Sequence, residues 1–305
     1  MQLWRIHIKP DAEEGIVPID FCIKKNIAGI GWGLSRPPTS KDDYRSLVET
    51  EYPVLFSKNW PNWRKSWCPA TNAILDYIQQ FDLIWTRNQQ AKYFLGRIEG
   101  GWQYDGSKEH AKADVINFRS CQWIEVGLMD NVPGSVINSF NRSATVQRVG
   151  DPDALLFSQY LYANHTKRPF TPPEKKRGVD ILQLLSNEDL EDAVALYLQV
   201  VKGFKLFPST CKLSTKAVEC LLVSPESGER IGMQVKSGQE SVDQDAFVGI
   251  SSDVYLFSAS GSYLGQPHAH VRCLSPDEIR KFVLSSRKLM PARMQRWIDF
   301  AEAYR

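Results

Sequence analysis

One stretch of the chain, residues 165–178 (HTKRPFTPPEKKRG), most constrains how the chain can fold. It contains three prolines and ends in a glycine. Proline restricts the residue before it to extended conformations, so this stretch is typical of an extended linker. The linker divides the 305 residues into two modules of ordinary domain size, 1–164 and 179–305.

The linker also holds the excess of positive charge. It carries five basic residues and one acid, whereas 1–164 have 18 basic against 18 acidic residues and 179–305 have 14 against 16. Two interpretations remain open. The stretch is either a solvated tether, or its basic residues contact phosphates as the linker passes nucleic acid. In the second case the predicted phosphate contacts are Lys175, Lys176 and Arg177.

Composition excludes several classes of protein. A hydrophobic share of 43% and a charged share of 24% are typical of globular domains and exclude a disordered, collagen-like or coiled-coil chain. No apolar run is long enough to span a membrane, and the first residues lack the features of a secretory signal. The six cysteines lie far apart without a CxxC pair. They indicate reduced thiols in a cytoplasmic protein, not a zinc site or a disulfide scaffold.

The first module reads mostly as β-strands with a few helices. Eight of the nine tryptophans precede the linker, which indicates two different domains. Alternation from residue 3 to 9 predicts an opening strand, and IAGIGWGL (27–34) places three glycines around Trp32. Strand-like runs follow between 82 and 126. We expect an α+β module built on a strongly bent, partly closed β-barrel.

Four segments of this module resemble one known family. GIGWG, FDLIWTR, YFLGRIEGGWQY and INFRSCQWIEV are similar to the EVE and YTH-related branch of the PUA-like superfamily. The resemblance implies an aromatic pocket that receives a flipped or modified base, with Trp32 as one wall. The further candidates for base binding are Trp85, Trp102, Trp123, Arg97 and Arg119. The alternative for each tryptophan is packing in the core.

The order of helices and strands in the second module predicts an α/β domain. Residues 186–201 form the clearest helix, with Ser186 as its cap. Two strands, 216–224 and 230–238, form a hairpin, and a third strand lies at 252–260. Helices are expected again at 275–284 and 291–305.

The hairpin concentrates the residues suited to chemistry. Alternate residues of a strand share a face, so Gln234 and Lys236 point the same way. Glu219 is an acid set among apolar neighbours on the preceding strand, where burial is costly unless the carboxylate is paired or binds a metal ion. An acid, a polar residue and a lysine on adjacent strands suit metal-assisted phosphodiester hydrolysis. The alternative is an ordinary cross-strand pair between Glu219 and Lys236.

This pattern resembles the PD-(D/E)xK nuclease superfamily, and within it the Mrr-like restriction branch with a QxK motif. By that resemblance, Glu219 takes the position of the metal-binding acid and Gln234-Val235-Lys236 is the QxK. Glu191 matches the acid on the first helix of the family. The resemblance implies Mg²⁺ or Mn²⁺ held by Glu219 and Gln234, with Lys236 activating water.

Together the two modules predict a modification-dependent DNA endonuclease of the type IV restriction kind, acting in the cytoplasm against phage. The first module would read a modified base and the second would hydrolyse the backbone. Cutting both strands requires two active sites, so a homodimer is expected. Two alternatives stay open: a nucleic-acid-binding protein with a degenerate nuclease fold, and a reader-nuclease directed at RNA.

Overall fold

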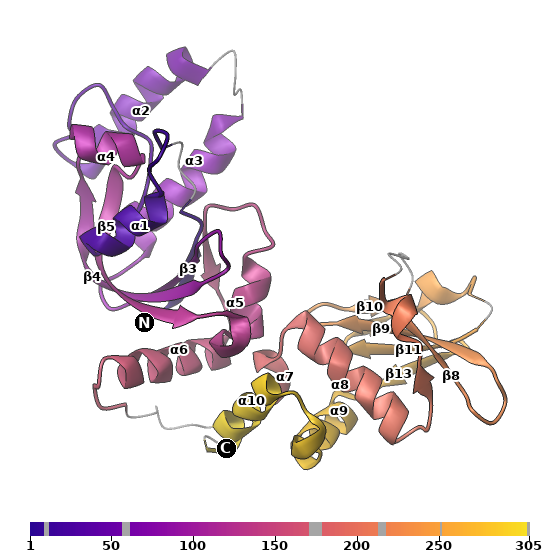
Figure 1. Ribbon diagram of the computed structural model, residues 1–305. Helices are drawn as coiled ribbons and strands as arrows, with labels where there is room; N and C mark the ends of the chain where they lie inside the picture. The colour runs from indigo at the N-terminus through magenta and orange to yellow at the C-terminus, as the bar shows by residue number, and fades with distance from the viewer. Residues whose placement is uncertain (9–11, 57–61, 171–178, 213–217, 251, 304–305) are drawn as a thin grey trace. The chain divides into compact units, whose positions relative to one another are not determined.

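The computed structural model describes residues 1–8, 12–56, 62–170, 179–212, 218–250 and 252–303 (Figure 1). The chain divides into two compact units. The first unit comprises Met1–Val132 and Ser139–Thr171, and the second comprises Pro133–Asn138 and Pro172–Arg305. The six residues 133–138, which the sequence analysis places in the first module, belong to the second unit.

The first unit is built on a six-stranded sheet with the order β2-β5-β4-β3-β1-β6. The strands β3, β4 and β5 are antiparallel neighbours, β1 runs parallel to β3, and β6 is antiparallel to β1. The strands are β1 (Leu3–Ile6), β2 (Ile27–Ile30), β3 (Leu83–Arg87), β4 (Tyr93–Tyr104), β5 (Asn117–Gly127) and β6 (Val146–Val149).

This sheet is open in the part of the chain that the structure describes. Its outermost strands, β2 and β6, each pair with one neighbour and not with each other. The β4–β5 register shifts between Ile98 and Trp102, where two glycines follow each other, and an irregularity of this kind bends a strand. No closed barrel is found among the described strands, and the partly closed β-barrel stays a prediction.

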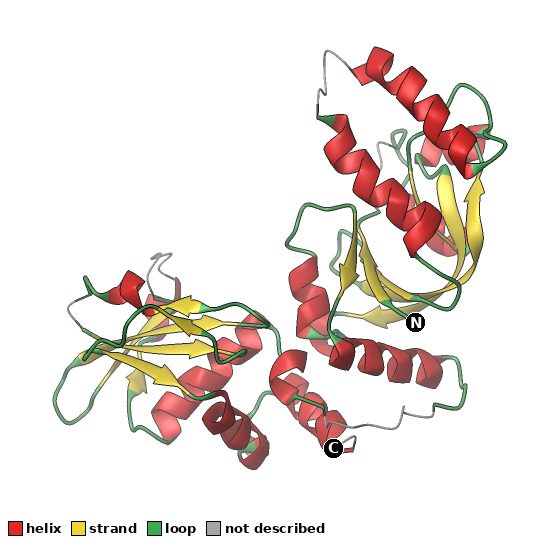
Figure 2. Cartoon of the chain, turned by 180° about the vertical axis from the view of Figure 1, so that it is seen from behind, coloured by secondary structure: helices red, strands yellow, loops and turns green. Residues whose placement is uncertain are grey.

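Helices lie on both sides of the first sheet (Figure 2). The helix α6 contacts β3 and β4 on one side, while α1 contacts β2 and α3 contacts β6 on the other. The short helix α5 has five of its six residues in the second unit. The helices are α1 (Pro18–Lys25), α2 (Lys41–Phe56), α3 (Trp63–Asn72), α4 (Lys108–Ala113), α5 (Gly134–Ser139) and α6 (Pro152–His165).

A buried arginine joins the helical part of the first unit to its sheet. The helix α3 continues into a π-helical turn, η1 (Ala73–Tyr77), whose carbonyl groups point toward β5. Arg119 of β5 is only 4% exposed and donates to the carbonyl oxygens of Ile74 at 2.6 Å and Leu75 at 2.9 Å. A third donor reaches the carbonyl oxygen of Gly100 at 3.2 Å. Its hydrogen bonds satisfy buried backbone groups that helix geometry leaves open.

The second unit is built on a five-stranded sheet with the order β13-β11-β9-β8-β7. The strands β9, β11 and β13 are parallel, and β8 pairs antiparallel with β9 in the predicted hairpin. A separate two-stranded sheet pairs β10 with β12. The strands are β7 (Lys205–Leu206), β8 (Cys220–Val223), β9 (Arg230–Lys236), β10 (Val242–Asp243), β11 (Asp253–Ser258), β12 (Tyr263–Leu264) and β13 (Val271–Leu274).

The long helices of the second unit begin as the sequence predicts. The helix α8 (Asn187–Val200) starts after Ser186, which forms a capping box with Asp189. The helices α9 (Pro276–Ser285) and α10 (Ala292–Ala303) follow the sheet. The helix α8 packs against β9 and α9, which places its first turns beside the hairpin. Among the described residues, every helix is too short or too polar to cross a membrane.

Replacement of Arg119 by methionine is expected to lower the free energy of unfolding by about 2 kcal/mol or more, because buried carbonyl groups lose their donors. The measurement is urea denaturation of the full chain. The control is Arg97→Met, since Arg97 forms a partly exposed pair with Glu99 at 2.8 Å whose loss costs about 1 kcal/mol or less. If both variants lose the same unfolding free energy, the hydrogen bonds of Arg119 do not stabilise the contact between η1 and the sheet.

Candidate functional site

The hairpin of the second unit brings Glu219 and Gln234 into contact. Cys220 pairs with Met233 in the β8–β9 register, and the Glu219 backbone N–H donates to the Met233 carbonyl at 2.7 Å. The side-chain amide of Gln234 donates to Oε1 of Glu219 at 2.5 Å. Gln234 is 7% exposed and Glu219 is half-buried. The pairing of the two strands therefore sets the acid directly beside the amide.

A second oxygen faces the same amide nitrogen. Nε2 of Gln234 lies 3.4 Å from the carbonyl oxygen of Val235. The nitrogen thus stands between a carboxylate oxygen and a backbone oxygen. An N–H₂ group satisfies these two acceptors, and a cation in its place would be attracted to the same two oxygens.

Glu191 and Lys236 belong to the same neighbourhood. Burial raises the pKa of Glu191 to about 7, and the carboxylate of Glu219 contributes to that increase. The Lys236 ammonium acts in the opposite direction, so Glu219 and Lys236 both lie within electrostatic reach of Glu191. Lys236 forms no ion pair with an acid in the described part of the chain. The cross-strand salt bridge considered as the alternative is therefore not formed between Lys236 and Glu219.

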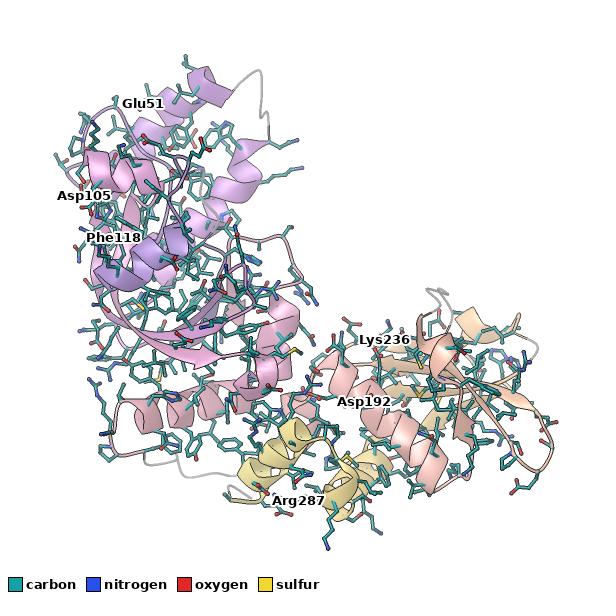
Figure 3. All side chains as sticks on the ribbon, viewed as in Figure 1. Glu51, Asp105, Phe118, Asp192, Lys236 and Arg287 are labelled. Atoms are coloured by element: carbon teal, nitrogen blue, oxygen red, sulfur yellow. The ribbon has the colours of Figure 1, made fainter. Side chains whose placement is uncertain are left out.

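Asn138 ties the end of β9 to the start of α8. Its side-chain amide donates to Oδ1 of Asn187 at 3.1 Å and lies 3.3 Å from the hydroxyl of Ser237. Asn187 is the first residue of α8, and Ser237 directly follows Lys236. Figure 3 labels Lys236 where the sheet meets α8. Asn138 could not be found from the sequence, because it precedes the linker and comes close to these residues only in the folded chain.

The donor set suits a hard divalent cation. No group of three His, Cys, Asp or Glu side chains that could hold a metal ion occurs among the described residues. Mg²⁺, however, is commonly held by one or two carboxylates, and water and substrate phosphates complete its shell. Glu219, the Val235 carbonyl and Glu191 offer oxygens of this kind. Gln234 presents its nitrogen to Glu219, so its amide would have to turn to become a ligand.

In the first unit, Trp32 adopts an unusual backbone conformation. Its φ is +66°, in the left-handed region that rarely suits a bulky residue. Asn117 of β5 holds this turn, because its amide donates to the carbonyl oxygens of Gly31 at 2.7 Å and Trp32 at 3.1 Å. A Cβ at Gly31 would lie 2.3 Å from the Asp114 carboxylate, so a larger residue before Trp32 would force that carboxylate to move. The fold thus maintains a strained turn that presents a half-buried indole.

Further aromatic side chains gather around this turn. Trp102 donates its indole N–H to Oδ1 of Asn117 at 3.2 Å, and the Tyr44 hydroxyl donates to the Trp32 carbonyl at 3.2 Å. The ring of Tyr44 lies 5.8 Å from that of Trp102 and 6.1 Å from that of Tyr104. Trp32, Trp102 and Tyr104 are half-buried, whereas Tyr44 is buried. We call Trp32, Tyr44, Trp102, Tyr104 and Asn117 the aromatic group.

The structure brings together two of the six predicted base-binding residues, Trp32 and Trp102. The prediction that Trp85 binds a base must be corrected. Its side chain is fully buried and donates to the hydroxyl of Ser158 at 3.0 Å. Arg119 must also be corrected, since its donors are committed to backbone carbonyls. Their positions follow from long-range packing, which a strand pattern does not reveal.

The remaining two, Trp123 and Arg97, lie elsewhere on the sheet. Trp123 is half-buried against Gly96 and donates to the Ile27 carbonyl at 2.9 Å. Arg97 pairs with Glu99 and lies over the ring of Phe81 at 5.2 Å. Neither is hydrogen-bonded to the aromatic group. Tyr44, Tyr104 and Asn117 were missed by sequence reasoning, because tyrosine and asparagine on their own are ordinary structural residues.

The predicted phosphate contacts of the linker, Lys175, Lys176 and Arg177, lie outside the described residues. They stay predictions. All six cysteines are free thiols.

Comparison with known proteins adds little to this geometry. No family model matches the chain, and no curated protein matches it in sequence. Among solved structures, a DNA modification-dependent restriction endonuclease, AspBHI, matches weakly, with 10% sequence identity and a TM-score of 0.20. The match covers 92% of this chain and 81% of that chain. A score at this level carries no argument, so function must be inferred from the site itself.

The raised pKa of Glu191 predicts a dependence of stability on pH. The folded state binds the Glu191 proton more tightly than the unfolded chain, whose pKa is near 4.5. Wild-type stability should therefore fall as pH rises from about 4.5 to about 7, because over this range the unfolded chain loses the proton that burial and the charge of Glu219 make the folded Glu191 retain. Glu191→Gln should remove this pH dependence. The free energy of unfolding of the variant should therefore rise relative to that of the wild type as the pH approaches 8.

The measurement is urea denaturation at pH 5, 6, 7 and 8 without divalent ions. Glu226→Gln, an exposed acid on the β8–β9 turn, serves as the control and should keep the wild-type profile. If the unfolding free energies of wild type and Glu191→Gln change with pH in parallel, Glu191 is not buried close to Glu219 and Lys236.

Proposed function

We propose that the second unit is a Mg²⁺-dependent phosphodiester hydrolase of the PD-(D/E)xK type. The observation that carries this proposal is the meeting of Glu219 and Gln234, with Lys236 and Glu191 within electrostatic reach. The order along the chain supports it as well, since the helix with Glu191 precedes the acid strand and then the QVK strand.

Each side chain has a role in this hydrolysis. A bound Mg²⁺ would supply positive charge to polarise the phosphate and to lower the pKa of a water molecule. Glu219 and the Val235 carbonyl would hold it, with Glu191 as a further carboxylate. Lys236 is not engaged by an acid within the described residues, so its ammonium is available to orient the attacking water and to stabilise the charge that develops on the phosphate oxygens.

Gln234 and Asn138 would position these groups. Gln234 holds Glu219 from the neighbouring strand, and Asn138 fixes the backbone just beyond Lys236. In the reaction, a bond forms between the water oxygen and phosphorus, and the bond from phosphorus to the leaving sugar oxygen breaks. The proton of the attacking water passes to solvent or to a basic group at the site, and the leaving sugar oxygen takes up a proton from solvent to become a hydroxyl.

We further propose that the first unit is a PUA-like module that reads a base of DNA, and that the half-buried rings of the aromatic group, Trp32, Trp102 and Tyr104, bind that base. Flat half-buried rings suit a base taken out of the stack, and the buried Asn117 would hold the turn that presents Trp32. The complete protein would then be a modification-dependent DNA endonuclease of the restriction kind, acting as a homodimer in defence against phage.

Two alternatives are tested by the same experiments. A degenerate nuclease would bind nucleic acid without cutting it. The absence of an ion pair to Lys236 among the described residues favours an active site over this alternative. A reader-nuclease of RNA would use the same side chains, since both nucleic acids present phosphodiesters and flat bases.

Lys236→Ala is expected to reduce cleavage at least 100-fold while binding is retained, because the variant loses the group that acts on the water. The assay incubates modified and unmodified plasmid DNA, and modified RNA, with Mg²⁺ or Mn²⁺. Glu219→Gln should likewise lose cleavage, and EDTA should abolish cleavage by the wild type. Lys288→Ala, an exposed lysine of the same unit, should cut as the wild type does. Binding by the wild type without cutting any substrate would establish the non-catalytic alternative.

Trp32→Gly is expected to weaken binding of the recognised base about 5- to 150-fold, the equivalent of one lost stacking contact. Glycine suits the φ of +66°, so the backbone turn should be kept. Fluorescence anisotropy with a labelled oligonucleotide measures the dissociation constant. Trp123→Leu removes a half-buried indole outside the aromatic group and should bind normally. Unchanged binding by Trp32→Gly would exclude this turn as the base site.

A further inference from the structure

Three arginines of the first unit gather where the parallel strands β1 and β3 end. Arg5 lies on β1 and pairs in register with Trp85, so Arg87, two residues further along β3, points to the same face. Arg142 lies in the segment that leads into β6, and its carbonyl oxygen is 3.2 Å from Nε2 of His7. None of the three arginines forms an ion pair with an acid in the part of the chain that the structure describes.

Arg5 is a buried cation whose hydrogen-bond partners, among the residues that the structure describes, are neutral groups. It is 0% exposed and donates to the carbonyl oxygen of Ser139 at 2.7 Å, to Oε1 of Gln147 at 2.8 Å and to the carbonyl of Ala144. Burial, together with the charges of Arg142 and Arg87, lowers the pKa of Arg5 to about 10. The folded protein therefore holds like charges together at a cost in stability.

The ring of Phe140 organises this basic cluster. The guanidinium carbons of Arg5 and Arg87 lie 5.5 Å and 5.0 Å from the ring centroid. Tyr93 and His7 pack edge-on against the same ring at 5.6 Å and 5.2 Å. A cation over an aromatic face is attracted to it, so the ring holds Arg87 in a defined place.

The outer two arginines keep donors for a ligand. Arg87 is half-buried and uses one donor, at 3.3 Å to the Tyr93 hydroxyl. Arg142 is exposed. A guanidinium has five N–H donors in a planar fork, which matches two oxygens of a phosphate. An oxyanion here would relieve the repulsion among the three cations.

We propose that Arg87 and Arg142, above the buried charge of Arg5, form a phosphate-binding site that contacts the backbone of nucleic acid. The chemistry of the ligand is a phosphate oxyanion, and the source to which we commit is a phosphodiester. This inference rests on the proposed function, because it supplies a contact to the backbone of the nucleic acid that the first unit is proposed to read.

The test is the salt dependence of binding by the full chain, with an uncleaved duplex oligonucleotide in the absence of divalent ions. Each lost phosphate contact reduces the slope of log K against log salt by about 0.9, so Arg87→Gln/Arg142→Gln should lose about 1.8. Arg87→Lys/Arg142→Lys keeps the charge and should retain most of the slope, which a merely structural role would not explain. Arg148→Gln is the control, since Arg148 is exposed on β6 and adjacent to Gln147, so it points to the other face.

The outcomes separate this inference from the proposed function. If the wild type binds and the double glutamine variant keeps the full slope, the phosphate site is overturned and the nuclease proposal stands. If the wild type binds no nucleic acid, both are overturned. If inorganic phosphate raises the melting temperature of the wild type but not of the variant, while the slope is unchanged, the site binds free phosphate and the assignment to nucleic acid is wrong. A variant that melts well below the wild type is replaced by the single substitution Arg142→Gln, whose exposed side chain can be removed without disturbing Phe140.

Discussion

The antiparallel pairing of β8 with β9 is the constraint on which the candidate site depends. The register of this pair sets Cys220 opposite Met233 and thereby places the Glu219 carboxylate beside the Gln234 amide. A strand alternates its side chains between two faces, so a slip by one residue would turn Gln234 and Lys236 away together. The parallel pairing of β9 with β11 holds the other edge, with Lys236 opposite Ser258. The geometry of the candidate site therefore depends on backbone hydrogen bonds more than on any one side-chain contact.

The sequence was sufficient for features that depend on local pattern. Ser186 caps α8 as the helix signal predicts, and the hairpin of β8 and β9 lies where alternation and turn residues place it. Only the family resemblance predicted that Glu191 lies near the hairpin. The rise of its pKa to about 7 comes from burial and from Glu219, and both are seen only in the folded structure. Asn138 could not be predicted at all, because it lies about fifty residues before α8 in the chain.

The first unit shows the limit of sequence reasoning more clearly. Trp85 and Trp32 look alike as tryptophans in strand-like segments, yet one is fully buried and the other is half-buried on a turn with positive φ. What distinguishes them is the packing around each. The helix α6 covers the face of the sheet that carries Trp85, through Ser158, whereas Asn117 reaches across from β5 to hold the turn at Trp32. Neither interaction has a period or a motif that a single sequence displays.

The net charge of +2 conceals two places where like charges are held close together. Glu191 and Glu219 share one site in the second unit, and Arg5, Arg87 and Arg142 share another in the first. Each arrangement costs free energy in the folded protein, since the charges repel and are partly buried. A fold that only needed stability would pair or disperse them, as it does for Arg293 with the buried Asp189. Within the described residues, neither the pair of carboxylates nor the three guanidinium groups has an opposing salt bridge. A divalent metal ion would supply the missing charge at the first place, and a phosphate would supply it at the second.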